Sequence, residues 1–210
     1  MQLIQKNMKP EKIVLASGNQ KKLKELSEIL NQFEIDVVPQ SQFNVTEAVE
    51  DGLTFVENAI KKARNACEQT GLPSISDDSG IEVDYLNGEP GIYSARFAGE
   101  GANDEANLNK LIDSLHGVSA ELRTARYQCV IVYMRHAADP TPIIAQDCWE
   151  GVLLDEKIGD GGFGYDPIFF SPEHNKTAAQ MTAEEKAAVS HRGKALKRFA
   201  DTFKIYQNQN

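Results

Sequence analysis

The sequence predicts an α/β protein built on a mixed β-sheet flanked by helices, and three observations support that prediction. In the first half of the chain, short apolar runs rich in β-branched residues alternate with segments of helical periodicity. Long β-rich runs then follow one another, which is typical of antiparallel neighbours. Helical periodicity returns near the C-terminal end. This order of elements favours a sheet that contains both parallel and antiparallel pairs.

The first predicted elements are two strands with a helix between them. Lys12–Ala16 is short, apolar and β-branched, and it runs into Ser17-Gly18-Asn19, a sequence typical of a turn and a helix N-cap. Ile35–Val38 is the second predicted strand. Between them, apolar residues three or four positions apart form one face of a helix: Leu23, Leu26, Leu30 and Phe33.

A second helix and a third strand follow. Thr54–Glu57 has the spacing of a capping box, and Gly71 supplies the stop for the helix that begins there. Ser74–Ser76 is predicted as a short strand. We expect it to end where Asp77-Asp78-Ser79-Gly80 begins, so that this acidic run forms a tight loop at the end of the strand.

The rest of the chain adds further strands and helices. Asn103 or Asp104 caps a helix with these apolar residues on one side: Leu108, Leu111, Ile112 and Leu115. Three β-rich runs follow, the first two predicted as adjacent antiparallel strands: Arg126–Arg135, Pro142–Trp149 and Gly151–Glu156. A second capping box at Thr182–Glu185 begins the C-terminal helical region, and Gly193 predicts a break or bend in it.

Length and composition favour one domain with its own core. The 210 residues are 41% hydrophobic and 25% charged, which is ordinary for a globular protein. We assign residues 1–10 to a short polar N-terminal extension and residues 11–206 to a single domain, because no linker or repeat divides the chain. We expect neither a signal peptide nor a membrane span, since no apolar run is long enough.

Cysteine content and net charge argue against two classes of function. The three cysteines include no CxxC pair, which argues against a structural zinc site and fits a reducing compartment. The net charge of −9, from 22 basic and 31 acidic residues, argues against binding to nucleic acid polymers. A small anionic ligand stays compatible, because it needs only a local basic pocket.

The loop after the first strand has the features of a phosphate site. Free N–H groups at a helix start favour anions, and Gly18 lets the backbone approach a ligand closely. Lys21 and Lys22 lie in the first helical turn, where a cation opposes the helix dipole unless an anion offsets it. The P-loop pattern GxxxxGK[ST] is absent. An ordinary turn with solvated lysines is the alternative.

The acidic run suggests metal-dependent hydrolysis. Asp77 and Asp78 repel each other, and a divalent cation relieves that repulsion. Mg²⁺ prefers one or two carboxylates with water and phosphate oxygens, and another carboxylate can orient or deprotonate the attacking water. An Asp/Ser/Gly turn is the alternative. Among the acidic residues before Gly52, we favour Glu50 as a further metal ligand, although most acidic loops are merely solvated.

Two later segments suggest a nucleotide base. Gly159–Pro167, the glycine-rich loop, holds four glycines around two aromatic residues. An exposed aromatic residue in this loop can stack on a base, and Asp166 can accept a hydrogen bond from a base or ribose. A β-bulge with core aromatics is the alternative. A basic set lies near the C-terminal end, with a solvated patch as the alternative: Lys186, Ser190, His191 and Arg192. The side chains of His191 and Arg192 can donate hydrogen bonds to a carbonyl oxygen, and Lys186 shares a helix face with Ser190.

Together these segments resemble the inosine triphosphate pyrophosphatase family, also called the non-standard purine NTP (XTP/dITP) pyrophosphatases. The resemblance runs from about Lys12 to Phe203. Bacterial members often carry Thr where this chain has Ser17, which keeps the hydroxyl. The matching motifs are SGNQKK (Ser17–Lys22), EDGLTFVENA (Glu50–Ala59), DDSGIEVDYLNGEPGIYSARFAG (Asp77–Gly99), GGFGYDPIF (Gly161–Phe169) and EEKAAVSHRGKAL (Glu184–Leu196).

The resemblance implies a homodimeric, cytoplasmic, Mg²⁺-dependent enzyme that hydrolyses ITP, dITP and XTP to the monophosphate and pyrophosphate. It implies an elongated α/β fold of two lobes with the active-site cleft between them. Asp78 would be the proton acceptor, and Glu50, Asp77 and Asp78 would serve Mg²⁺. The implied substrate-binding residues are Ser17, Gly18, Asn19, Gln20, Lys21, Lys22, Ser79, Phe163, Gly164, Tyr165, Asp166, Lys186, His191 and Arg192.

Two other functions stay open at this point. A Maf-type pyrophosphatase would act on other modified or pyrimidine nucleotides, but the His191-Arg192 pair and the glycine-rich loop favour a purine. A nucleotide sensor would bind without turnover, and the acidic pair argues against it. For a purine, we expect His191 or Arg192 to donate to the 6-oxygen of hypoxanthine or xanthine, which adenine lacks.

Overall fold

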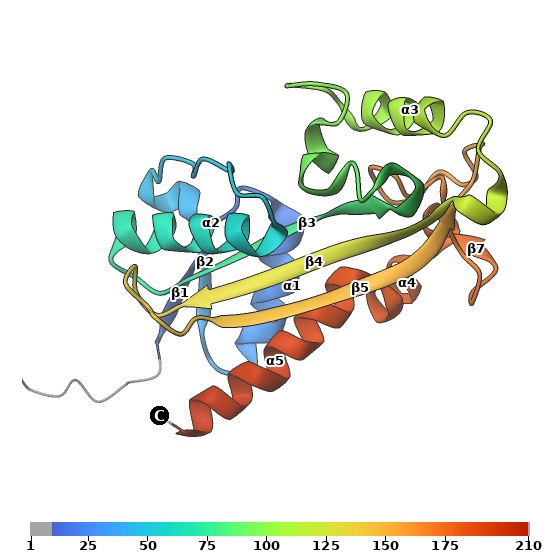
Figure 1. Ribbon diagram of the computed structural model, residues 1–210. Coiled ribbons are helices and arrows are strands. Elements are labelled where there is room, and N and C mark those ends of the chain that lie inside the picture. Colours follow the sequence, from blue (N-terminus) through green and yellow to red (C-terminus); the bar gives the residue numbers. More distant parts are fainter. Residues whose placement is uncertain (1–9, 210) are drawn as a thin grey trace, which may run out of the picture. The chain divides into compact units, whose positions relative to one another are not determined.

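The computed structural model describes residues 10–209, without the side chains of Gln20, Lys21 and Gln209. Seven strands within these residues form one sheet in the order β2-β1-β3-β4-β5-β6-β7 (Figure 1). β1 pairs in parallel with β2 and β3, while β6 pairs antiparallel with β5 and β7, so the predicted mixed sheet is confirmed. The strands are β1 (Lys12–Leu15), β2 (Asp36–Pro39), β3 (Ser74–Val83), β4 (Thr124–Met134), β5 (Ile143–Leu153), β6 (Phe169–Ser171) and β7 (Lys176–Thr177).

Most helices begin at the predicted signals, but the first ends at Asn31, so Phe33 lies beyond it and not on its apolar face. Asn103 proves to be the N-cap of α3, where its side chain accepts from the N–H of Ala106. Thr54 caps α2, and Gly71 ends it in the left-handed conformation. No helix within residues 10–209 is long and apolar enough to cross a membrane. The α-helices are α1 (Gln20–Asn31), α2 (Phe55–Thr70), α3 (Asp104–Ser114), α4 (Ala183–Val189) and α5 (His191–Gln209).

The chain divides into two compact units, each with residues from separate parts of the sequence. Unit 1 comprises residues 1–78, 130–146 and 195–210, and unit 2 comprises residues 79–129 and 147–194. The strands β3, β4 and β5 and the helix α5 contribute residues to both units. The expected extension at 1–10 lies, apart from Pro10, outside the described residues.

In unit 1, helix α2 packs closely against the sheet because its inward side chains are small. Ala59, Ala63 and Ala66 have no exposed surface. Ala66 belongs to a cluster with Val14 of β1 and Val38 of β2. Removing these small side chains from water stabilises the unit, and their size lets the helix backbone come near the strands.

Two buried serines fix which side of β3 faces α2. The hydroxyl of Ser74 donates to the carbonyl oxygen of Ala63, and the hydroxyl of Ser76 donates to that of Ala59, both at 2.6 Å. Side chains alternate between the two faces of a strand. The even-numbered residues of this part of β3 therefore face α2, and the odd-numbered residues face away from it.

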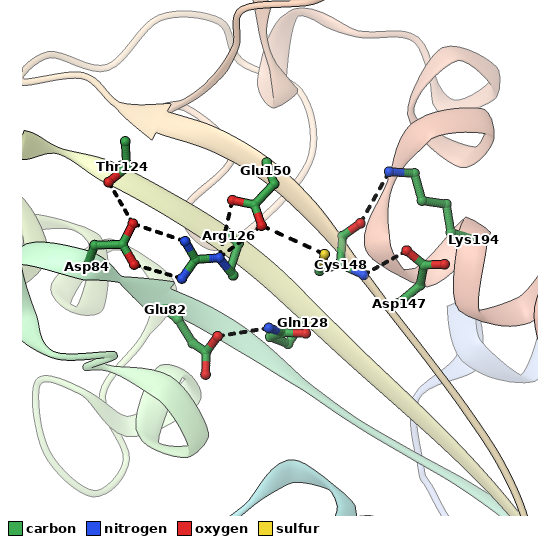
Figure 2. Close-up of polar contacts among 9 residues, drawn as sticks. All are labelled: Glu82, Asp84, Thr124, Arg126, Gln128, Asp147, Cys148, Glu150 and Lys194. Carbon is green, nitrogen blue, oxygen red and sulfur yellow. Dashed lines mark hydrogen bonds and ion pairs between the residues drawn. The ribbon is translucent and has the colours of Figure 1, made fainter. Parts of the chain in front are cut away.

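In unit 2, the strands β3, β4 and β5 each have one apolar face and one polar face. Tyr127 of β4 and Trp149 of β5 lie in a buried cluster with Leu108 and Leu111 of α3. Arg126, one position before Tyr127, belongs to the polar face shown in Figure 2. The residues that form hydrogen bonds or ion pairs with one another on this face include Glu82, Asp84, Thr124, Arg126, Gln128 and Glu150.

Three further expectations from the sequence were wrong. β3 does not end at Ser76 but continues to Val83, so Asp77-Asp78-Ser79-Gly80 lies in a strand and not in a loop. The run Gly151–Glu156 is no separate strand, because β5 continues to Leu153. In each case the extended backbone continues across residues that favour turns, since sheet pairing overrides local preference.

The third error concerns the C-terminal helical region. The predicted break is present, but it lies at Ser190 and not at Gly193, which is in the first turn of α5. Ser190 has extended backbone angles, ends α4, and accepts from the N–H of Gly193 over 3.1 Å. A Cβ atom on Gly193 would lie 1.8 Å from the carbonyl oxygen of Ala187. Gly193 is therefore required by the close approach of α4.

Candidate active site

The carboxyl end of β1 is the point in unit 1 where the strand order reverses. β1 lies between β2 and β3, and its parallel pairing with both sends the chain first to one side and then to the other. Ligands of open α/β sheets bind at such a switch point. The predicted phosphate loop follows β1 directly at this point.

Local hydrogen bonds shape the predicted phosphate loop. The hydroxyl of Ser17 accepts from the N–H of Asn19 over 3.1 Å. The side-chain oxygen of Asn19 accepts from the N–H of Lys22 over 3.3 Å, which is the pattern of an N-cap for α1. Gly18 is exposed, and a Cβ there would meet no atom within 4 Å. The side chains of Gln20 and Lys21 lie outside the described residues.

The two adjacent aspartates contact lysines from different helices. The buried carboxylate of Asp77 lies 2.8 Å from the ammonium of Lys22 on α1. The carboxylate of Asp78 accepts from the ammonium of Lys62 on α2, also over 2.8 Å. The alternation along β3 explains this difference, because Asp78 shares the α2 side with Ser76 and Asp77 points to the other side.

Glu50 joins the same group of charges. Its carboxylate lies 3.2 Å from the ammonium of Lys62. The next turn is fixed by Asn58, whose buried side-chain oxygen accepts from the N–H of Gly52 over 2.8 Å. A Cβ on Gly52 would lie 2.7 Å from that oxygen, so glycine is required there. The loop that carries Glu50 is thus held against α2.

Burial shapes the electrostatics of these groups. Burial raises the pKa of Asp78 above its usual value, and the charges of Glu50 and Asp77 add to that rise while Lys62 opposes it. Burial opposes the charge of Lys62, but the nearby carboxylates outweigh it and raise the pKa of Lys62. Lys62 therefore stays cationic, and Asp78 is a stronger base than an exposed aspartate.

A pocket of about 150 Å³ lies among these residues in unit 1. It brings together five of the predicted site residues and adds others, notably Lys62. Its volume is below the roughly 300–1,000 Å³ of a typical small-molecule site, so it suits one part of a ligand. The lining residues are Ala16, Ser17, Gly18, Lys22, Gln40, Glu47, Ala48, Glu50, Lys62 and Asp77.

The donor set around the pocket suits magnesium. Among residues 10–209, no three His, Cys, Asp or Glu side chains form a metal-binding group by themselves. Mg²⁺ seldom takes such a cage and usually binds one or two carboxylates, with water and substrate phosphates completing its shell. Asp77, Asp78 and Glu50 supply oxygen atoms of this kind beside Lys22 and Lys62.

In unit 2, the buried carboxylate of Asp166 organises the glycine-rich loop. One of its oxygens accepts from the N–H of Phe163 over 2.9 Å and also from the ammonium of Lys186. The other oxygen accepts from the hydroxyl of Tyr127 over 3.2 Å. Gly162 has a φ of +76° and lies so close that a Cβ would be 2.0 Å from the carboxylate. Its absent side chain makes this arrangement possible.

The two aromatic residues of the glycine-rich loop have different surroundings. Phe163 is 59% exposed, and the ammonium of Lys186 lies 4.8 Å from the centre of its ring. Tyr165 is buried, and its hydroxyl donates to the carbonyl oxygen of Ser94 over 2.7 Å. The exposed ring of Phe163 suits stacking on a base, whereas the ring of Tyr165 is part of the core.

The start of α5 places His191 and Arg192 beside other predicted residues of unit 2. The imidazole of His191 stacks on the ring of Tyr127, with centroids 4.7 Å apart and planes 15° apart. The guanidinium of Arg192 donates to the hydroxyl of Ser79 over 3.3 Å. Each of these four residues belongs to unit 2.

Three residues in these groups escaped prediction from the sequence. For Lys62 the sequence offers only a weak indication of a role in the site: it is next to Ala63, which faces the sheet. Asp104 was considered only as a cap, but its carboxylate also accepts from the N–H of Gly164 over 2.9 Å. For Tyr127 the sequence offers no such indication, because a tyrosine in an apolar strand is expected to be a core residue.

Comparisons with known proteins agree with this fold. A model of the Ham1 family matches residues 13–202. The chain is 55% identical over 194 residues to a "dITP/XTP pyrophosphatase" from Salmonella paratyphi A, covering 92% of this chain and 98% of the relative. It is 57% identical over 187 residues to a "dITP/XTP pyrophosphatase" from Vibrio parahaemolyticus, with coverage of 89% and 94%.

Solved structures give the same result. A HAM1 protein from Coxiella burnetii aligns with a TM-score of 0.89 and 45% identity, covering 92% of this chain and 98% of that one. The Ham1 protein of Staphylococcus aureus aligns with a TM-score of 0.86 and 39% identity, with coverage of 93% and 99%. The fold and the pocket together define an α/β protein that has charged groups at the switch point of its sheet.

The chain belongs to the Ham1 family, which confirms the resemblance seen in the sequence.

Proposed function

We propose that this protein hydrolyses non-standard purine nucleoside triphosphates, namely ITP, dITP and XTP, to the monophosphate and pyrophosphate. The name "dITP/XTP pyrophosphatase" carried by its relatives supports this proposal. The observation that carries it in the structure is the pocket at the switch point, where Lys22 and Lys62 lie beside carboxylates. Such a pocket offers partners for both a triphosphate and a divalent cation.

The residues of the pocket suit the phosphate chain. The loop after β1 ends at the N-terminus of α1, where the helix dipole favours an anion. The ammonium of Lys22 can exchange its contact with Asp77 for a phosphate oxygen. Ser17 and Asn19 add polar groups beside it. We assign Ser17–Lys22 to the triphosphate.

The hydrolytic step follows from the surroundings of Asp78. Water attacks the α-phosphorus, the bond from that phosphorus to the bridging oxygen breaks, and pyrophosphate leaves. Asp78 orients the water and accepts its proton, for which its raised pKa is favourable. Lys62 holds the carboxylate of Asp78 in place through its hydrogen bond. Lys22 neutralises charge that grows on the leaving group.

Magnesium is the cofactor that we propose for this pocket. Glu50, Asp77 and Asp78 would hold it, since they provide the oxygen ligands that Mg²⁺ prefers. When bound, it would neutralise charge on the phosphate oxygens and the leaving pyrophosphate.

Recognition of the base is assigned to residues of unit 2. Phe163 stacks on the purine ring, and Asp166 and Lys186 contact the nucleotide through the glycine-rich loop. His191 or Arg192 donates to the 6-oxygen of hypoxanthine or xanthine. An amino group at that position, as in adenine, would oppose the same donor, and such a mismatch can cost about 10⁴-fold. Guanine also has a 6-oxygen, so this donor does not reject GTP.

One assay tests the proposal against its rivals. Pyrophosphate release is measured with ITP, dITP, XTP, GTP, ATP and dUTP, with Mg²⁺ and with EDTA. We expect release from ITP, dITP and XTP only when Mg²⁺ is present. Preference for dUTP would favour a Maf-type enzyme. Binding of ITP without release would favour a nucleotide sensor.

We also propose that the protein is a homodimer and acts in the cytoplasm. The likeness to the family supports both assignments. Sedimentation equilibrium over a range of concentrations tests the first, with about twice the mass of 23.2 kDa as the expected result. Imaging of the tagged full-length chain in its host tests the second.

A further inference from the structure

Tyr127 contacts two of the residues assigned above to base recognition. Its hydroxyl donates to the carboxylate of Asp166 over 3.2 Å. Its ring stacks on the imidazole of His191, with centroids 4.7 Å apart. Asp166 and His191 come from different parts of the sequence, and the side chain of Tyr127 contacts both of them. Because Tyr127 is buried, it acts on a ligand through these neighbours.

The position of Tyr127 is itself well defined. Its ring lies 4.6 Å from that of Phe169 and 6.4 Å from that of Trp149, measured between centroids. Burial raises the pKa of Tyr127 well above its usual value, and the charge of Asp166 adds to the effect. The hydroxyl therefore remains protonated and can donate throughout the neutral range.

The hydrogen bond from Tyr127 completes the set of donors around Asp166. The other carboxylate oxygen already accepts from Phe163 and Lys186. With a donor at each oxygen, the plane of the carboxylate is fixed. That orientation in turn fixes Lys186, whose ammonium lies over the ring of Phe163. Loss of the hydroxyl would leave one side of the buried carboxylate with a weaker restraint.

We propose that Tyr127 is a positioning residue for base recognition. Its hydroxyl orients Asp166, and its ring sets the plane of His191, so that both are arranged before the nucleotide binds. Such preorganisation lowers the cost of binding. The proposal rests on the proposed function and adds a residue that positions the groups assigned to base recognition.

The test compares Tyr127→Phe with wild-type enzyme in steady-state hydrolysis of ITP, XTP and ATP. The variant keeps the ring stacked on His191 and removes only the hydroxyl. We expect the KM for ITP to rise about tenfold, as for loss of one hydrogen bond to a charged group, with kcat changed by less than about twofold. The preference for ITP over ATP should change less, because the ring that stacks on His191 is retained. An unchanged KM would overturn the proposal.

A matched control separates positioning from general packing. Tyr133 is also a buried tyrosine of β4, and its ring contacts those of Phe203 and Tyr206. We expect Tyr133→Phe to leave KM and preference unchanged. A KM increase of similar size in this control would show a general effect of removing a buried hydroxyl and would contradict the proposal.

A second variant tests the coupling to Asp166. If Tyr127 acts through that carboxylate, Tyr127→Phe should raise the KM little further in an Asp166→Asn background. Full additivity of the two changes would refute the coupling. If Tyr127→Phe fails to fold, the Asp166→Asn variant provides the test. A KM equal to that of wild type in this variant would overturn the proposal.

Binding without turnover distinguishes this proposal from the proposed function. Trp149, the single tryptophan of the sequence, lies beside Tyr127 and can report binding of IMP by its fluorescence. We expect the Kd for IMP to rise about tenfold in Tyr127→Phe. Equal values in both proteins would overturn the positioning role even if hydrolysis proceeds. Wild-type enzyme that releases no pyrophosphate from any purine would instead contradict the proposed function.

Discussion

At the scale of single residues, Asp77 and Asp78 have different surroundings although they are neighbours in sequence. Asp77 is 5% exposed and lies against Lys22, while Asp78 pairs with Lys62, which also contacts Glu50. Each aspartate thus has a cation that substrate or metal can displace. The pairing also limits repulsion between the two carboxylates before a ligand arrives.

The first prediction concerns the base that activates water. Asp78→Asn should lower kcat about 10²–10⁴-fold, because the amide cannot accept the proton of the attacking water. Circular dichroism should show a folded variant. Asp51→Asn is the matched control, since it removes a carboxylate from the same region that is exposed and paired with Lys61. Near-normal turnover in Asp78→Asn would exclude this carboxylate as the base.

The second prediction concerns purine selectivity. Arg192→Ala should reduce the ratio of kcat/KM for ITP to that for ATP, because it removes a donor assigned to the 6-oxygen. A loss of about tenfold to a hundredfold is expected for a hydrogen bond to a charged donor. Arg198→Ala, at an exposed position of the same helix, is the control. The donor assignment fails for Arg192 if the ratio in its variant equals that of wild type.

At the scale of elements, the junction of α4 and α5 depends on a single absent side chain. Gly193→Ala should destabilise the protein by about 1–3 kcal/mol, because its Cβ would overlap the carbonyl oxygen of Ala187 and force the helices apart. Urea denaturation measures the loss. Lys197→Ala, on the exposed face of α5, should stay within about 0.5 kcal/mol of wild type. Equal stability of Gly193→Ala and wild type would show that the junction adapts freely.

The connection between β4 and β5 is closed by one buried carboxylate in unit 1. Asp139 is 4% exposed and accepts from the guanidinium of Arg135 over 2.8 Å. It also accepts from the N–H groups of Arg135 and Thr141, each over 3.0 Å. Burial tends to raise the pKa of Asp139, but these donors outweigh it and lower the pKa to about 2. The folded state therefore favours the ionised form.

This shift gives a pH-dependent prediction. Because the folded pKa lies below the unfolded one, the stabilisation by Asp139 is complete above about pH 4 and is lost as the pH falls towards about 2. Asp139→Asn should cost about 2 kcal/mol at neutral pH, and its difference from wild type should shrink below about pH 4. Urea denaturation between pH 3 and 7 checks this, with the exposed Asp201→Asn as control. A difference independent of pH would contradict the charge effect.

At the scale of the whole molecule, the periodicity and the local capping signals of the sequence were enough to predict the fold class and where most helices and strands begin. Thr54, Gly71 and Thr182 act through local hydrogen bonds or local backbone angles, so their effect is visible in a short window. The extent of β3 was not predictable in this way. Its continuation through four polar or small residues depends on neighbouring strands, and pairing partners cannot be read from a local segment.

The candidate site was predictable where function requires an unusual local sequence. The glycines around Phe163 and the pair of adjacent aspartates are each visible in a short stretch of sequence, although a bulge or a turn could also explain them. Lys62 and Tyr127 were missed because each follows the ordinary pattern of its element. Their importance comes from contacts with residues far away in sequence, such as Asp78 and Asp166.

The alternation along β3 also constrains how this protein can evolve. Deleting one residue between Ser76 and Asp78 would leave composition and hydrophobicity nearly unchanged. It would nevertheless reverse which side chains point towards α2, so that the remaining carboxylate, Asp78, would meet the wrong partner. Substitutions in this strand can be gradual, but a change in its length by one cannot. Among descendants of this gene, we expect insertions and deletions to accumulate in the surface connections and to spare the segment from Ser74 to Asp78.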